Sequence, residues 1–120
     1  MASVLAWGAS GQQTAPQEPP EEDESVAGKH TYSFNPLQAE KEIKVGDFYS
    51  KKGSHKAATL RYREATRWNP GSAEAWLKLG ESLEKQRDRK GANEAYARYL
   101  ELEPQGKSAR QVRKKLAGKP

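Results

Sequence analysis

Cysteine is absent from this 120-residue sequence, and histidine occurs only as His30 and His55. Without cysteine there is no disulfide, no thiolate metal site, no cysteine nucleophile and no cysteine to carry a lipid. The two histidines are far apart in the sequence, and neither has a neighbouring set of metal ligands. No run of about 18 apolar residues occurs either, so no transmembrane helix is predicted.

The usual sequence signatures of catalysis are also missing. The chain contains no Gly-rich phosphate loop, no nucleophile elbow and no HExxH sequence. Glu81 and Glu84 lie three residues apart in a predicted helix, on a mixed face with Lys78 and Lys85. That pattern favours ion pairs at i,i+4 spacing over an acid–base couple. The sequence therefore indicates a protein that is not an enzyme and that uses no cofactor or metal ion.

Charge is unevenly distributed along the chain, whose net charge is +5. Residues 1–36 contain one lysine and five carboxylates, a net charge of −4, which leaves +9 on residues 37–120. A basic body with an acidic leader can bind an anionic partner, or its own leader when no partner is present. The alternative is that these charges belong to solvated helix faces and a solubilising tail.

Residues 1–34 are predicted to be a disordered leader rich in Pro and Glu, because they contain little that a core can bury. The run from Val4 to Trp7, followed by small residues, is similar to the end of a truncated secretory signal peptide. On that interpretation the mature protein is periplasmic or secreted in a bacterium, and otherwise it is cytoplasmic. Tyr32 and Phe34 are expected to pack over the first helix.

One sequence pattern occurs twice, in residues 36–69 and again 34 residues later in 70–103. Gly46 recurs as Gly80, and the other matched positions are Ala58 and Ala92, Tyr62 and Tyr96, and Pro70 and Pro104. A glycine inside a helix costs about 1 kcal/mol relative to alanine, so its recurrence predicts a close backbone crossing. The alanines and tyrosines share one face of the following helix and are expected to press on this glycine.

Helix start and stop signals divide residues 35–120 into five helices. The first four are predicted at 37–52, 55–68, 73–87 and 89–102, with Ser54, Ser72 and Asp88 as N-caps. They form two antiparallel hairpins in an all-α domain. The last, within 106–117, has an apolar stripe of Ala109, Val112 and Leu116 and is predicted to be a capping helix. No aromatic residues lie among its basic residues, which disfavours nucleic acid as a partner.

The two copies resemble tetratricopeptide repeats (TPRs). The resemblance rests in the first copy on Val45, Gly46, Tyr49, Ala58, Tyr62, Ala65 and Pro70. In the second copy it rests on Trp76, Leu79, Gly80, Leu83, Ala92, Tyr96 and Pro104. Departures from the family pattern occur at Glu42, Thr59, Asn93 and Tyr99. A weaker resemblance, carried by AYARYLELEP and the basic tail, is to repeat proteins of the bacterial envelope, including outer-membrane assembly factors.

The resemblance implies an α-α solenoid that acts as an adaptor or scaffold, with a concave groove that receives a peptide or helix of another protein. The positions that match the groove lining are Ile43, Lys44, Asp47, Lys51, Leu77, Lys78, Glu81 and Lys85. Ile43 and Leu77 are expected to supply apolar contact within a ring of charges. The alternative is that these are ordinary solvated faces.

Two other classes of function are left open by the sequence. One is an electrostatic binder of an anionic polymer, either nucleic acid or a membrane surface, through Arg61, Arg63, Arg67 and residues 107–119. The other is a self-associating module, because repeat stacks usually need three or more units to bury a continuous core. On this second view, the open end near Leu37, Ile43 and Phe48 is covered by the Tyr32–Phe34 segment or by a second subunit.

Overall fold

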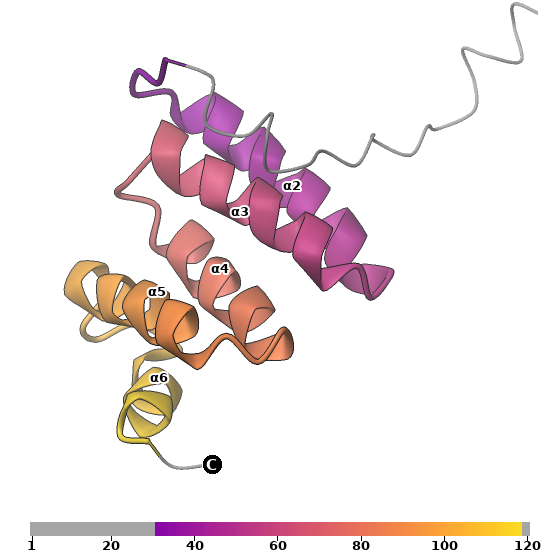
Figure 1. Cartoon of the computed structure of the whole chain (residues 1–120). Helices are drawn as coiled ribbons and strands as arrows, with labels where there is room; N and C mark the ends of the chain where they lie inside the picture. The colour runs from indigo at the N-terminus through magenta and orange to yellow at the C-terminus, as the bar shows by residue number, and fades with distance from the viewer. Residues whose placement is uncertain (1–30, 119–120) are drawn as a thin grey trace, which may run out of the picture.

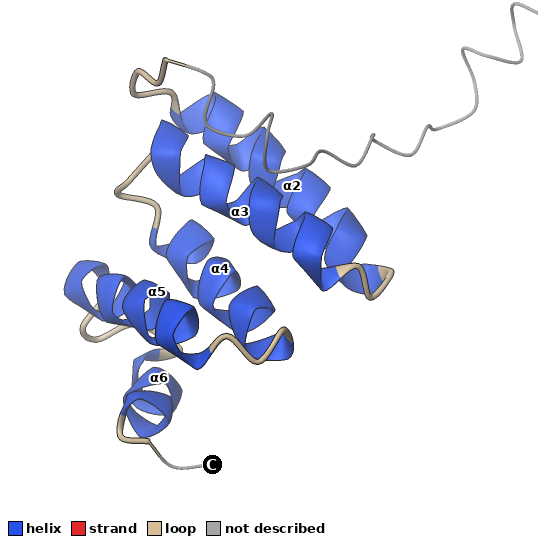
Figure 2. Cartoon of the chain, viewed as in Figure 1, coloured by secondary structure: helices blue, strands red, loops and turns tan. Residues whose placement is uncertain are grey.

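The computed structural model describes residues 31–118, which form five α-helices and no β-strand (Figures 1 and 2). The helices are α2 (Pro36–Lys51), α3 (His55–Trp68), α4 (Ala73–Lys85), α5 (Arg89–Leu102) and α6 (Ala109–Leu116). The all-helical prediction is confirmed for this part of the chain, and each predicted helix end lies within three residues of the observed one. The predicted signal-peptide remnant and most of the acidic leader fall in residues 1–30, outside the described residues.

Each copy of the repeat forms a helical hairpin. The N–H of Asn35, just before α2, donates to the carbonyl oxygen of Trp68 at the end of α3 (2.9 Å), so α2 and α3 run antiparallel. α4 packs on α5 in the same way, and α3 contacts α4 between the hairpins. α6 packs on α5, so α2 and α6 lie at opposite ends of the molecule (Figure 1).

The two hairpin turns have the same geometry. Gly53 and Arg87, which are 34 residues apart, both have left-handed backbones, with φ of 82° and 65°. After each of them the next N–H donates across the turn, from Ser54 to the Tyr49 carbonyl (2.9 Å) and from Asp88 to the Leu83 carbonyl (3.0 Å). Glycine takes this conformation freely, whereas arginine does so at a steric cost.

All three predicted residues occupy N-cap positions, and two of them make a capping hydrogen bond. The Ser72 hydroxyl accepts from the N–H of Ala75 (3.2 Å), and the Asp88 carboxylate accepts from the N–H of Gly91 (2.9 Å). Ser54 is the N-cap of α3, but its side chain makes no capping hydrogen bond and the residue is held by its backbone in the turn. At the start of α2, the side chain of Asn35 accepts from the N–H of Gln38 (3.0 Å).

The repeated glycines lie beneath tyrosine rings. A Cβ placed on Gly46 would be 2.5 Å from the ring of Tyr62, and one on Gly80 would be 2.6 Å from the ring of Tyr96. The expected close approach is present, but the group that needs the space is a ring from the next helix and not a backbone. Ala58 and the matching Ala92 are buried on the same helices as these tyrosines.

Three of the residues that depart from the repeat pattern make polar contacts with other side chains or with the backbone. The buried carboxylate of Glu42 pairs with Arg61 (3.1 Å), and Thr59 donates to the hydroxyl of Ser82 on α4 (2.7 Å). The buried Tyr99 accepts from the N–H of Ser108 (3.2 Å), just before α6. These positions are therefore part of the packing, because hydrogen bonds offset the cost of burying their polar groups.

Tyr32 and Phe34 do not pack over the first helix as expected. The ring of Tyr32 meets Trp68 of α3 edge to face, with ring centroids 5.0 Å apart, and its hydroxyl donates to Glu64 (2.6 Å). Phe34 is 73% exposed. Tyr32 finds both an aromatic face and a buried carboxylate on α3, whereas α2 presents lysines and exposed apolar side chains at its surface.

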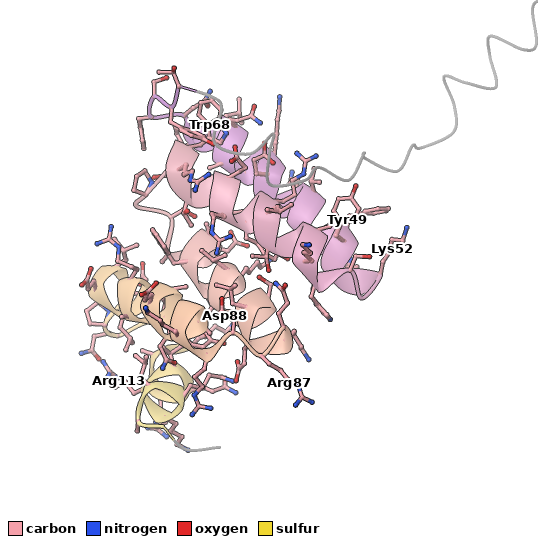
Figure 3. All side chains as sticks on the ribbon, viewed as in Figure 1. Tyr49, Lys52, Trp68, Arg87, Asp88 and Arg113 are labelled. Atoms are coloured by element: carbon pink, nitrogen blue, oxygen red, sulfur yellow. The ribbon has the colours of Figure 1, made fainter. Side chains whose placement is uncertain are left out.

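The predicted capping helix is observed as α6, which begins at Ala109 and follows a turn. Ala109 and Val112 are buried against α5, and Leu116 is half-buried beside them, which confirms the predicted apolar stripe. Arg113 turns back to donate to the carbonyl oxygen of Pro104 (Figure 3). α6 therefore covers α5 with one face, while Arg110 and Lys114 are exposed.

Candidate functional site

A cleft of about 470 Å³ lies where α2, α3, α4 and α6 meet. α4 supplies most of its lining, and the other three helices supply the rest. Its lining residues are Ser50, His55, Tyr62, Lys78, Glu81, Ser82, Glu84, Lys85 and Lys115. Because these residues come from four helices, the cleft exists only when both hairpins and α6 are packed together.

One carboxylate ties three helices together at the wall of the cleft. Asp47 of α2 accepts two hydrogen bonds from Lys78 of α4 (2.8 and 2.9 Å) and one from the hydroxyl of Tyr62 of α3 (2.6 Å). Glu74 lies 3.4 Å from the same ammonium group. These contacts fix the position and the protonation of Lys78.

The pKa values at this wall follow from these contacts. Burial lowers the pKa of Lys78, but the hydrogen bonds and charge of Asp47 outweigh it, so the pKa is raised above its ordinary value. Burial and the Asp47 carboxylate raise the pKa of Tyr62 far above the physiological range. Lys78 is therefore a cation and Tyr62 a neutral donor whenever Asp47 is ionised.

The same three-way arrangement occurs again one hairpin later. Glu84 of α4 accepts from the hydroxyl of Tyr96 of α5 (2.6 Å) and from Lys115 of α6 (2.9 Å). The hydrogen bond from Tyr96 is the main cause of a lowered pKa of Glu84, and Lys115 adds to it. In each case one carboxylate, of α2 or of α4, accepts from a tyrosine of the following helix and from a lysine of the helix after that.

A second cavity adjoins the first and shares Glu84 and Lys115 with it. It has a volume of about 270 Å³ and is also lined by Arg87, Arg89, Ala92, Asn93 and Tyr96. Figure 3 shows Arg87 and Asp88 at the connection between α4 and α5. The two cavities together extend from α2 to α5.

Glu81 and Lys85 are at i,i+4 spacing, but they do not form the expected ion pair. Neither makes an ion pair among residues 31–118, whereas Lys78 pairs with Asp47 and Glu74, and Glu84 pairs with Lys115. Burial raises the pKa of Glu81, and the charges of Lys78 and Lys115 only partly oppose it. The cleft thus holds one carboxylate and one ammonium group whose charges are not compensated by direct contact.

The predicted groove residues are only partly brought together. Lys78, Glu81 and Lys85 line the cleft, and Asp47 holds its wall. Lys44 and Lys51 are exposed on α2 but are not among the lining residues.

The apolar part of the groove prediction needs correction. Ile43 is only 5% exposed and belongs to the core, because the packing of α2 on α3 covers it. It offers almost no surface to a partner. Leu77 is half-buried and packs against the same core.

His55, Ser82 and Lys115 were not foreseen as cleft residues. Asp47 and Lys78 are 31 residues apart, as are Glu84 and Lys115. This spacing is the signal that identifies Lys115 in retrospect. His55 and Ser82 have no comparable signal, since their places in the cleft depend on how α3 packs on α4.

The arginines expected to bind anions are partly engaged elsewhere. Arg61 pairs with Glu42 (3.1 Å), and Arg67 lies 3.3 Å from Glu64 within α3. Within residues 31–118, no group of three His, Asp or Glu side chains is arranged to hold a metal ion. None of the described helices is long and apolar enough to cross a membrane.

The sequence matches no protein-family model and no curated protein.

Proposed function

We propose that this protein is a TPR-like adaptor without catalytic activity, and that it binds a peptide segment of another protein in the cleft between α2, α4 and α6. The repeat supports this proposal, because Gly46 with Tyr62 and Gly80 with Tyr96 make the same contact 34 residues apart. The observation that carries it is the polar cleft of about 470 Å³, which four helices build together.

The residues of the cleft favour a charged, extended peptide over an apolar helix. Ile43 is buried and Leu77 is half-buried, and neither of them lines the cleft, so no aliphatic side chain of the predicted groove is available to an apolar helix there. The ammonium group of Lys85 has no ion-pair partner among the described residues, so it can pair with an acidic side chain of the peptide. Glu81 suits a donor, such as a backbone N–H or a basic side chain.

This proposal predicts that Lys85→Glu weakens peptide binding. A library of displayed peptides would be selected on the immobilised full chain, and the enriched peptides are expected to contain acidic residues. Their affinity for Lys85→Glu, measured by calorimetry, should fall about tenfold, as is typical when a charge that faces its partner is reversed. Lys90→Glu on α5 is the matched control, because Lys90 is an exposed lysine that lines neither cavity.

Two results would contradict the proposal. One is that no peptide sequence is enriched. The other is an equal loss for Lys85→Glu and Lys90→Glu, which would mean that net charge alone controls binding. Binding of a DNA oligonucleotide that is lost between about 50 and 200 mM salt would instead support the electrostatic alternative.

A further inference from the structure

The outer face of α2 is the most exposed apolar surface in the described chain. It begins at Phe34, which is 73% exposed, and includes Leu37 at 67% and Phe48 at 36%. Lys41, Lys44 and Lys52 follow the same helical stripe at spacings of three and four residues. We call these six residues the α2 face. It is separate from the cleft, since none of them lines it.

In the second copy of the repeat, the corresponding face belongs to α4, and α3 packs against it. At an offset of 34 residues, Lys41 corresponds to Ala75, Phe48 to Ser82 and Lys52 to Gln86. Ala75 and Ser82 are buried, and α3 packs on α4.

Hydrogen bonds to Thr59 join this face of α4 to α3, and Gln86 also donates to the carbonyl oxygen of His55 (3.4 Å). Ser82 accepts from the hydroxyl of Thr59 of α3 (2.7 Å), and Gln86 donates to the same hydroxyl (2.6 Å). The corresponding face of α2 therefore has the position of a helix–helix contact. No helix within residues 31–118 occupies it.

The side chains of the α2 face indicate which kind of helix fits there. α4 approaches α3 through small residues, whereas α2 presents Leu37 and Phe48 among lysines. Lys41 and Lys44 make no ion pair among the described residues. Lys52 lies over the ring of Phe48, 5.3 Å from its centroid. A matching surface needs apolar side chains flanked by carboxylates.

A second copy of this chain does not meet that need. A symmetric contact between two α2 faces brings the lysines of one copy against those of the other, which is unfavourable. A head-to-tail stack would have to place α5 against α2, but α5 is already covered by α6 through Ala109 and Val112.

We propose that the α2 face docks an amphipathic helix of a partner protein. The apolar stripe of that helix covers Leu37 and Phe48, and its Asp and Glu side chains pair with Lys41 and Lys44. Leu37 and Phe48 are eleven residues apart in one helix, which places them about 16 Å from each other along its axis. A docked helix of three to four turns is long enough to contact both.

The experiment is a fluorescence titration of the full chain with two synthetic helical peptides. Both peptides carry the same leucines at i, i+4, i+7 and i+11, and their flanking positions are glutamate in one and lysine in the other. The glutamate peptide is expected to bind at least about tenfold more tightly than the lysine peptide. Phe48→Ser, which copies the residue of the second repeat, is expected to weaken it about tenfold.

Two further variants separate the α2 face from general effects. Leu102→Ser removes an apolar side chain that is 39% exposed on α5 and is expected to leave binding unchanged. Lys41→Glu combined with Lys44→Glu is expected to reverse the preference, so that the lysine peptide binds more tightly. Because that variant gains a ligand, loss of folding cannot produce the expected result.

The proposal is overturned if both peptides bind equally, or if Phe48→Ser and Leu102→Ser have the same effect. A doubled mass of the free protein in sedimentation, lost in Phe48→Ser, would assign the face to a second copy instead. Replacing the five carboxylates of residues 18–24 by amides should not change the affinity. An increase of about tenfold would show that the acidic leader occupies the face and would equally overturn the proposal.

Discussion

At the scale of single residues, the fold depends on a ring that lies on a glycine. Tyr96 needs the space that the missing side chain of Gly80 leaves, and its hydroxyl then reaches Glu84 at 2.6 Å. The same holds for Tyr62, Gly46 and Asp47. One small residue therefore controls both the packing of a hairpin and the position of a carboxylate at the cleft.

Gly80→Ala is predicted to destabilise the protein. The helix gains about 1 kcal/mol in propensity, but overpacking against Tyr96 costs about 1–3 kcal/mol, so the expected net loss reaches about 2 kcal/mol. The free energy of unfolding would be measured in urea. Gly71→Ala is the control, because its Cβ would make only an ordinary contact, 3.5 Å from Asn69. Greater stability of Gly80→Ala would show that the ring moves aside freely.

Arg87→Gly is predicted to stabilise the protein. Arg87 has a φ of 65°, a conformation that costs a residue with a side chain about 1 kcal/mol more than it costs glycine. The matching turn of the first hairpin already has Gly53. Thermal unfolding is therefore expected to shift upward for Arg87→Gly and downward for Lys90→Gly, which places glycine inside α5. A lower melting temperature for Arg87→Gly would mean that its side chain contributes more than its backbone costs.

At the scale of the helices, the helix ends could be predicted from local signals in the sequence. The contacts between residues far apart in the sequence could not. Pro36, Gly53, the Asn69–Gly71 segment and Pro104 punctuate the sequence, and the helices begin and end beside them. The partners of the charged residues were predicted less well. Lys78 bonds to Asp47, 31 residues away, whereas the sequence favoured pairs at i,i+4 spacing within one helix. The burial of Ile43 likewise depends on α3, which the pattern of α2 alone does not contain.

α6 is predicted to loosen in acid because Glu84 holds it through Lys115. Tyr96 and Lys115 lower the pKa of Glu84, so their contribution to stability is complete above the ordinary pKa of a glutamate and is lost as the pH falls through the lowered value. Hydrogen-exchange protection of the α6 amides should therefore decrease at low pH relative to that of α2. Glu84→Gln is expected to produce the same loss at neutral pH.

Glu101→Gln is the control for this prediction, since Glu101 pairs only with Arg98 of its own helix (3.1 Å). Equal protection of α6 in wild type and Glu84→Gln would show that Ala109 and Val112 hold the helix without the ion pair.

At the scale of the whole molecule, the two hairpins cooperate through a small interface. α3 and α4 meet at the buried pair Thr59 and Ser82, and Gln86 adds a hydrogen bond to Thr59. Asp47 and Lys78 join the hairpins a second time, at the wall of the cleft. In stacked repeats, such contacts between neighbours decide whether the units unfold together. The cleft requires both hairpins, so the same interface also controls its integrity.

Thr59→Val is therefore predicted to reduce cooperativity as well as stability. The valine keeps the shape of the threonine but removes the hydrogen bond to the buried Ser82 and one of the two acceptors of Gln86, at a cost of about 1–2 kcal/mol. If this weakens the interface enough for the hairpins to separate, the urea transition broadens and its slope falls. Thr66→Val is the matched control, because its hydroxyl donates to the Arg63 carbonyl within α3 (2.7 Å) and makes no bond across the interface. A steep transition in both variants would mean that apolar packing alone couples the hairpins.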